Sequence, residues 1–153
     1  MRRNGSMSAR LSATVLLGWM LMGPGMAQDQ PYAVEYYYQV QWGYLDEFLE
    51  LYKRNHYPVL VRLREKGDIL EMSAAYPAYH AGEDTRWDFR FTIVWKDVNT
   101  ALRQDRAEGE IVEALYPDAV TFADEERRRF QLLVQHLDVP VRRDDLSGWK
   151  TTP

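Results

Sequence analysis

The segment that most constrains the fold is "RWDFRFTIVWKD", residues 86–97, in which apolar and polar side chains alternate. A period of two is typical of a strand with one buried face. The segment "YAVEYYYQVQW", residues 32–42, shows the same alternation, and residues 68–76 are predicted to form a further strand. A last strand is predicted at 138–146, where Pro140 restricts it to a sheet edge or a strand start. The chain is therefore expected to form a four-stranded sheet.

One amphipathic helix is predicted between the first two strands, because apolar residues recur every three or four positions from Leu45 to Leu63. Pro58 lies inside this helix, although proline in a helix interior costs about 3 kcal/mol. Because the residue before a proline avoids helical geometry, we expect a bend near His56. Lys66, followed by glycine, is typical of a helix end.

A second and longer helical region is predicted to follow, ending at Leu137. Asp97 is expected to cap its start, and "YPD" at 116–118 is expected to break it, because proline cannot continue a helix. The apolar stripe in the last part of this region places His136 near the C-terminus of the final helix. The helical stretch 105–137 has no predicted role.

The order of these elements is strand, helix, strand, strand, helices, strand. It predicts the α+β class with a ferredoxin-like βαββαβ arrangement, an antiparallel sheet with helices on one face. The first and third strands carry bulky or semi-polar side chains on both faces. We therefore expect a second copy to pack sheet against sheet and to enclose a partly polar space. Which sheet face lines that space stays open.

The N-terminus is typical of a secretory signal. Three arginines among the first ten residues precede an apolar run of 13 residues, from Leu11 to Gly23, and small residues follow. We predict a signal peptide at 1–27, cleaved after Ala27. The alternative is a membrane anchor, but a spanning helix needs about 20 apolar residues.

Removal of 27 of the 153 residues leaves 126, which fits one domain, predicted at 28–146 with a loose tail at 147–153. The signal contains three arginines and no acidic residue, so the formal net charge changes from −4 to −7. An acidic exported protein, periplasmic or extracellular, is a poor candidate for nucleic-acid or anionic-membrane binding. The chain has no cysteine, which excludes disulfides, a thiolate nucleophile and a lipoprotein anchor.

Three short motifs, together with the strands around them, resemble the dimeric α+β barrel superfamily, nearest to its NIPSNAP-like and EthD-like branches. The residues that carry the resemblance are Gly43, Glu47, Phe48, His56, Pro58, Trp95 and Asp97. The resemblance spans 32–102 and implies a ferredoxin-like protomer that forms a homodimer. The superfamily includes cyclases, monooxygenases and haem-handling enzymes, so membership alone implies no reaction. The longer helical region departs from those families, which implies a lid, an altered pocket or an extended dimer contact.

His56 is the best candidate for chemistry, because imidazole titrates near neutrality and can act as a general base or a metal ligand. In the catalytic hypothesis His56 carries the proton. Tyr36 or Tyr38 then orients the substrate, and Arg90 stabilises developing negative charge. In the alternative, His56 is a partly buried histidine bonded to a carbonyl group that Pro58 leaves free.

Large rings are frequent, at 13% of the chain. They either form the core and a dimer interface or line a flat slot for an aromatic ligand. The predicted ligand-binding residues are Trp42, Trp87, Phe89 and Trp95. Arg90 is expected either to neutralise a carboxylate or phenolate in that slot or to pair with Glu35 across the sheet.

No metal site is predicted, and no cofactor is identified. His80, with Glu83 and Asp84 nearby, is a weak metal-binding candidate, because one histidine and two carboxylates suit several divalent ions. The alternative is an exposed loop histidine. There is no Walker or Rossmann glycine pattern, no H-E-x-x-H and no G-x-S-x-G, which disfavours nucleotide enzymes, zincins and serine hydrolases.

The predicted function is that of an exported small-molecule-binding homodimer. The first hypothesis is an enzyme that uses histidine acid–base chemistry on an aromatic or polyketide-like substrate. The second is a non-catalytic ligand-binding or structural dimer, and the third is haem or metal binding through His56 or His80. No nucleic-acid partner is expected, and no membrane contact after signal cleavage.

Overall fold

The computed structural model describes residues 30–79, 81–144 and 146–151, with the backbone alone at 104–106. The predicted signal peptide with its cleavage after Ala27, and the candidate metal ligand His80, lie outside the described residues. Within the described part of the chain, no helix has both the length and the apolar character needed to span a membrane.

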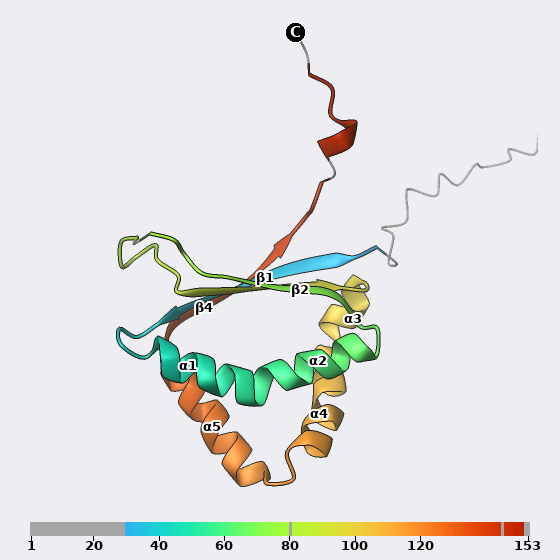
Figure 1. Ribbon diagram of the computed structural model, residues 1–153. Helices are drawn as coiled ribbons and strands as arrows, with labels where there is room; N and C mark the ends of the chain where they lie inside the picture. Colours follow the sequence, from blue (N-terminus) through green and yellow to red (C-terminus); the bar gives the residue numbers. More distant parts are fainter. Residues whose placement is uncertain (1–29, 80, 145, 152–153) are drawn as a thin grey trace, which may run out of the picture.

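Four strands form one antiparallel sheet in the order β2-β3-β1-β4. Their bounds are Tyr32–Val40 (β1), Ile69–Ala75 (β2), Phe89–Trp95 (β3) and Leu133–Val141 (β4). The helices pack on one face of this sheet, and no helix of the described residues covers the other face (Figure 1). This strand order and this one-sided layering confirm the predicted ferredoxin-like α+β fold.

The predicted first helix is present, but it contains an irregular turn. It comprises α1 (Leu45–Leu51), a π-helical turn (Tyr52–His56) and α2 (Tyr57–Glu65). We call the middle segment the π-turn. Gly67 ends the helix with a φ of 83°, a left-handed conformation that glycine adopts without strain.

The second helical region consists of α3 (Val98–Leu102), α4 (Gln104–Leu115) and α5 (Ala119–Gln131). The Asp97 carboxylate accepts a hydrogen bond of 2.7 Å from a backbone N–H in the first turn of α3, which confirms the predicted cap. The predicted break at 116–118 is also confirmed, since α4 ends at Leu115 and α5 begins at Ala119.

The predicted end of the last helix at Leu137 is wrong, as is the predicted start of the last strand at residue 138. Helix α5 ends at Gln131, and residues 133–137 form the first half of β4. Apolar residues at 130, 133, 134 and 137 fit a helical period, but pairing along β1 provides a backbone ladder and selects the strand. His136 therefore lies in the middle of an edge strand, opposite Tyr38, and not near a helix terminus.

Side chains of β1 and β3 alternate between the face that the helices cover and the open face. The buried side chains of the covered face include Tyr38, Phe89, Phe91, Ile93 and Trp95. Glu35, Tyr37 and Arg90 are on the open face. Trp87 was expected to share the face of Phe89, but it packs edge-on against Tyr37 with ring centres 5.9 Å apart. The reason is that β3 begins only at Phe89, so the alternation does not extend back to Trp87.

Candidate functional site

A cavity of about 110 Å³ lies between the covered face of the sheet and the helices, and we call it the helix-side cavity. The residues with reactive or hydrogen-bonding side chains that line it include Tyr36, Tyr38, Tyr52, His56, Arg129 and His136. They come from β1, the π-turn, α5 and β4. Two imidazoles, three phenols, one guanidinium group and the carboxylates of Glu108 and Asp138 therefore line a small space.

The π-turn brings His56 to this cavity. Because Pro58 has no N–H, the carbonyl oxygen of Arg54 lacks its regular α-helical partner. The Tyr57 N–H bonds to the carbonyl oxygen of Tyr52, five residues earlier, which is the π-helical pattern. Such turns inside α-helices are frequent at functional sites. The bend was predicted because Tyr57 was expected to leave helical geometry, and this reason is wrong, since Tyr57 is helical with φ −58° and ψ −39°. The irregularity is the π-turn itself, and His56 is its last residue.

Two residues of the second helical region hold the π-turn. The Tyr116 hydroxyl lies 2.8 Å from the carbonyl oxygen of Arg54 and 3.0 Å from that of Asn55. The Glu125 carboxylate accepts hydrogen bonds from the Arg54 guanidinium, at 2.6 Å, and from the Asn55 amide, at 2.9 Å. Asn55 is only 1% exposed, so this bond satisfies a buried polar group. The freed carbonyl is bound by Tyr116 and not by the imidazole of His56.

His56 packs edge-on against Tyr52, with ring centres 5.0 Å apart. Hydrogen bonds between described residues do not involve its imidazole. Burial, the positive charge of Arg129 and the proximity of His136 lower the pKa of His56 to about 3. The imidazole is therefore neutral at physiological pH, and it lines the cavity.

Arg129 supplies a buried positive charge at the same cavity. Its side chain is 3% exposed, and two hydrogen bonds of 3.0 and 2.6 Å fix it on the Glu126 carboxylate. Its guanidinium carbon lies 5.8 Å from the centre of the Tyr52 ring. A guanidinium held in this way can stabilise an anionic oxygen on a bound molecule, because its geometry is set before the ligand arrives.

Tyr36 and Tyr38 of β1 are hydrogen-bonding groups and not bases. Burial raises the pKa of Tyr36 to about 12 and raises that of Tyr38 still further. The Tyr38 ring stacks on His136, with centres 4.4 Å apart. Burial lowers the pKa of His136, whereas the Asp138 carboxylate, 3.0 Å from Nε2, opposes that shift.

The structure brings His56, Tyr36 and Tyr38 together but places Arg90 elsewhere, so the predicted site needs a correction. Arg90 lies on the open face, where its guanidinium is 3.6 Å from the Glu35 carboxylate. Strand alternation separates this face from His56 by the thickness of the sheet. The predicted Arg90–Glu35 pair is confirmed, and the cation beside His56 is Arg129.

The four rings predicted to form a ligand slot do not share one site. Phe89 and Trp95 are buried in the core beneath the helices. Trp87 lies on the open face, and Trp42 follows β1 with 67% of its surface exposed. The indole N–H of Trp42 donates a hydrogen bond of 2.8 Å to the Glu83 carboxylate. The slot hypothesis is wrong for this set, because Trp42 and Trp87 line a hollow beside the loop after β2, whereas Phe89 and Trp95 do not.

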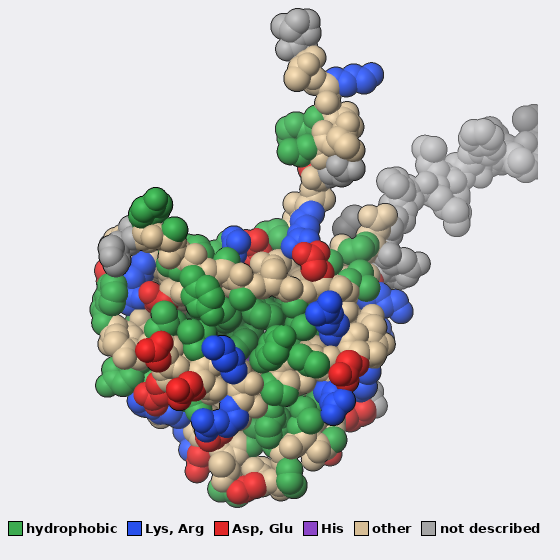
Figure 2. Space-filling view, viewed as in Figure 1, with side chains coloured by type: hydrophobic (Ala, Val, Ile, Leu, Met, Phe, Trp, Pro, Cys, Tyr) green, Lys and Arg blue, Asp and Glu red, His purple; other side chains and the backbone are tan. Residues whose placement is uncertain are grey.

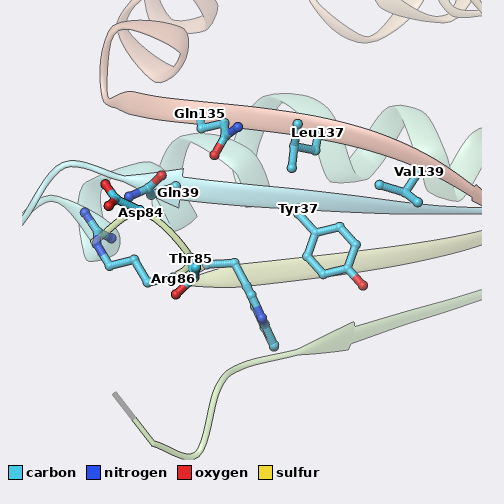
Figure 3. Close-up of a pocket in the computed structure, with 9 residues that line it drawn as sticks. Tyr37, Gln39, Asp84, Thr85, Arg86, Gln135, Leu137 and Val139 are labelled. Atoms are coloured by element: carbon cyan, nitrogen blue, oxygen red, sulfur yellow. The ribbon is translucent and has the colours of Figure 1, made fainter. Parts of the chain in front are cut away.

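The open face carries a larger hollow of about 510 Å³, which we call the open-face pocket (Figure 3). Tyr37 and Leu137 project into it from neighbouring positions of β1 and β4 (Figure 3). Arg86 lies at its other end, 6% exposed, and donates a hydrogen bond of 3.0 Å to the carbonyl oxygen of Val40. The pocket has apolar and aromatic walls and one polar end.

The proposed metal ligands of the loop after β2 are not assembled within the described residues. Glu83 accepts hydrogen bonds from Arg86 and Trp42, so its carboxylate is already engaged. Among the side chains that the structure describes, no group of three or more metal-ligating residues is present.

The residues of the site that sequence reasoning missed are on α5 and the connection that precedes it. Tyr116 belongs to the predicted helix break, and Glu125, Glu126 and Arg129 belong to the helical stretch for which no role was predicted. One signal could have identified Arg129: it lies three residues after Glu126, a spacing that places the two side chains on one helix face as an ion pair.

Comparison with solved structures supports the fold assignment. A dimeric ferredoxin-like protein from an uncultured marine organism matches with a TM-score of 0.52 and 6% identity, over 79% of this chain and 96% of that chain. An Arabidopsis thaliana protein matches with a TM-score of 0.50 and 15% identity, over 76% and 99%. A NIPSNAP family protein from Agrobacterium tumefaciens matches with a TM-score of 0.48 and 11% identity, over 79% and 100%.

At these identities the likeness shows the fold alone. The fold and the site define a ferredoxin-like α+β protein with a polar cavity between its sheet and its helices. Other similar structures are those of an EthD family protein from Bacillus halodurans and a NIPSNAP domain protein from Burkholderia xenovorans, with TM-scores of 0.49 and 0.48. No family model and no curated protein matches the sequence.

Proposed function

We propose that this chain is an exported homodimeric enzyme that moves a proton on a small molecule bound in the helix-side cavity. The observation that carries this proposal is the pairing of two groups in one cavity. His56 is a neutral imidazole, and Arg129 is a fixed cation. A base next to an anion-stabilising group is the arrangement that enolisation and related proton transfers require.

In this mechanism His56 takes a proton from a carbon or oxygen acid, and the electron pair left behind becomes an oxyanion beside Arg129. The low pKa of His56 disfavours protonation in the empty cavity. An anion formed nearby stabilises the imidazolium, so the two charges arise together. Return of the proton to another atom of the substrate regenerates neutral His56. Tyr36 and Tyr38, kept as neutral phenols, donate hydrogen bonds that orient the substrate.

The volume of the cavity limits which part of a substrate it can hold. An apolar cavity of about 150 Å³ holds one benzene molecule, and the helix-side cavity measures about 110 Å³. It therefore fits the reactive enol or phenol end of a molecule, with the remainder outside. Of the two predicted substrate classes, a polyketide-like molecule fits this limit better than an aromatic one, because its keto group can enter the cavity without a ring.

The proposed homodimer forms through the open face. Exposed apolar side chains of β4, Leu137 and Val139, flank the open-face pocket. Burial of these groups by a second copy removes apolar area from water. The similar protein from the uncultured marine organism is described as dimeric, which agrees with this proposal.

A non-catalytic ligand-binding dimer is the second candidate, and the depressed pKa of His56 favours it. A base with so low a pKa has little driving force unless the substrate becomes an anion. The same cavity would then bind a small anion through Arg129 without reaction. Haem binding has less support, because a porphyrin is much larger than the helix-side cavity.

Solvent-exchange measurements test the proton-transfer proposal without a known substrate. The native protein is incubated in D₂O with a panel of enolisable keto acids and phenols, and loss of C–H signals is followed by ¹H NMR. We expect one or more compounds to exchange with the native protein and not with His56→Gln. If no compound exchanges faster than in buffer, or if His56→Gln is equally active, the enzyme proposal is wrong.

Export is proposed from residues 1–27 and needs its own test. The full-length chain is expressed in a bacterial host, and periplasmic and cytoplasmic fractions are analysed by N-terminal sequencing. We expect periplasmic protein that starts at Gln28. Protein that keeps Met1 and stays in the cytoplasm contradicts the proposal.

A further inference from the structure

A third hollow, of about 360 Å³, lies where the edge strand β2 runs beside α1 and α2, and we call it the β2 groove. Its inner surface is formed by Phe89, Phe91 and Met72, and its rim carries the partly exposed rings of Tyr57 and Tyr76. Figure 2 shows hydrophobic side chains gathered on this side of the molecule, between β2 and the helices, with Lys and Arg side chains at the margin.

The aromatic walls of the β2 groove are held in place by the core. The ring centres of Tyr76 and Phe89 lie 5.4 Å apart. Those of Tyr57 and Phe91 lie 6.3 Å apart, with the rings edge to face. Phe89 and Phe91 are themselves buried by the helices. A preformed surface of this kind suits a flat aromatic or an acyl group, because little side-chain freedom is lost on binding.

Two cations line the same groove, Lys53 from the π-turn and Arg64 from α2. Nine arginines of the described residues lie within salt-bridge distance of a carboxylate. Ion pairs between described residues do not include Arg64 or Lys53, although the chain has an excess of acidic groups. Two cations without a carboxylate partner beside an apolar groove are complementary to an anion with an apolar body.

We propose that the β2 groove binds a small carboxylate with an aromatic or acyl body. The body lies on Phe89 and Phe91, and the carboxylate pairs with Arg64, while Lys53 adds positive charge to the same groove. This site differs from the helix-side cavity, since the Tyr52 ring lines both and separates them. Binding in the groove therefore does not require proton transfer at His56.

Calorimetric titration with 2-naphthoate and with uncharged 2-naphthalenemethanol tests the charge recognition. We expect the native protein to bind naphthoate more tightly than the alcohol, and Arg64→Gln to weaken naphthoate about tenfold, as expected for loss of a charged contact. The alcohol should change less than about twofold in the same variant. Arg62→Gln is the matched control, because Arg62 is an exposed arginine of the same helix that pairs with Glu65. Equal affinity of the native protein for acid and alcohol overturns the proposal.

A second variant blocks the groove without changing charge. Ala74→Leu adds three carbon atoms inside the β2 groove, whereas Ala75→Leu adds them on the open face, opposite Arg90. We expect Ala74→Leu to abolish binding of both ligands and Ala75→Leu to retain it. Unchanged naphthoate binding in Ala74→Leu overturns the proposal. A lower mass of Ala74→Leu than of the native protein in light scattering also overturns the proposal. It would show that the groove is an interface between copies of the chain. His56→Gln should bind naphthoate with native affinity. Failure of the enzyme proposal can therefore be distinguished from failure of the groove proposal.

Discussion

The Tyr116 hydroxyl donates a hydrogen bond of 2.8 Å to the carbonyl oxygen of Arg54, 62 positions earlier in the chain. Pro58 has no N–H to donate to that carbonyl oxygen, so the Tyr116 hydroxyl replaces the missing helical donor. It connects the end of α4 to the π-turn that carries His56. The second helical region, for which the sequence indicated no role, therefore supports the candidate site.

Removal of the Tyr116 hydroxyl should destabilise the π-turn. Tyr116→Phe keeps the ring, which stacks on Phe122 with centres 4.6 Å apart, and removes only the donor. We expect the free energy of unfolding to fall by about 1 to 2 kcal/mol in urea titrations, because a partly buried carbonyl loses its bond. Tyr79→Phe, at a residue 89% exposed, is the control and should change it by less than about 0.5 kcal/mol. Equal stability of the two variants contradicts the assigned role.

Glu125 should contribute more to the free energy of unfolding than its neighbour Asp124. Glu125→Ala leaves the buried Asn55 amide without its carboxylate acceptor, and we expect a loss of about 1 to 3 kcal/mol in the free energy of unfolding. Asp124→Ala removes an exposed pair with Arg127, and such pairs contribute about 0 to 1 kcal/mol. Urea unfolding of both variants measures the difference, and a larger effect at Asp124 would show that the contact with Asn55 has no importance.

The depressed pKa of His56 predicts a specific pH dependence of stability. In the unfolded chain the imidazole takes up a proton below about pH 6.5, whereas in the folded protein it stays neutral down to about pH 3. The unfolded state then binds more protons, so the free energy of unfolding falls as pH decreases through this window, by at most about 1.4 kcal/mol per unit from this group.

The comparison with His56→Gln isolates this contribution, because the carboxylates titrate in both proteins. We expect the difference in unfolding free energy, native minus variant, to shrink between pH 7 and pH 4. A difference that is constant with pH would mean that the His56 imidazole is accessible to protons in the folded protein.

Arg129 and Arg90 should differ in their effect on proton exchange. Arg129→Gln removes the cation beside the reacting atoms, and we expect the exchange rate to fall about 100-fold, as for loss of an oxyanion-stabilising donor. Arg90→Gln changes the opposite face of the sheet and should leave the rate within about twofold. ¹H NMR exchange rates of both variants check this, with folding verified by circular dichroism. A larger loss in Arg90→Gln would place the chemistry on the open face.

The proposed dimer predicts that a charge on the open face dissociates the protein. Leu137→Asp introduces a carboxylate next to Tyr37 at the proposed interface. We expect light scattering to give the mass of a dimer for the native protein and of a monomer for this variant, because burial of an unpaired charge is costly. Val120→Asp, at an exposed position of α5, should remain dimeric. Retention of the dimer in Leu137→Asp would exclude the open face as the interface.

The sequence alone predicted the elements whose cause is local. The alternation in β1 and β3, the helix that contains Pro58, the cap at Asp97 and the break at 116–118 are all confirmed. The start of β4 was not predicted, since residues 133–137 satisfy a helical period as well as a strand period. Pairing with β1, a contact distant in sequence, decides between them.

For the site, the sequence alone predicted that a proline-containing helix presents a histidine. It also predicted that Tyr36 and Tyr38 share one face of a strand. Only the tertiary structure decided which face that histidine meets and which cation accompanies it. The physical reason is that strand alternation sends Arg90 and Tyr38 to opposite sides of a sheet, while helix packing brings Arg129 from α5 to the covered side. Local patterns set the direction of each side chain, and the packing of distant elements decides which of them meet.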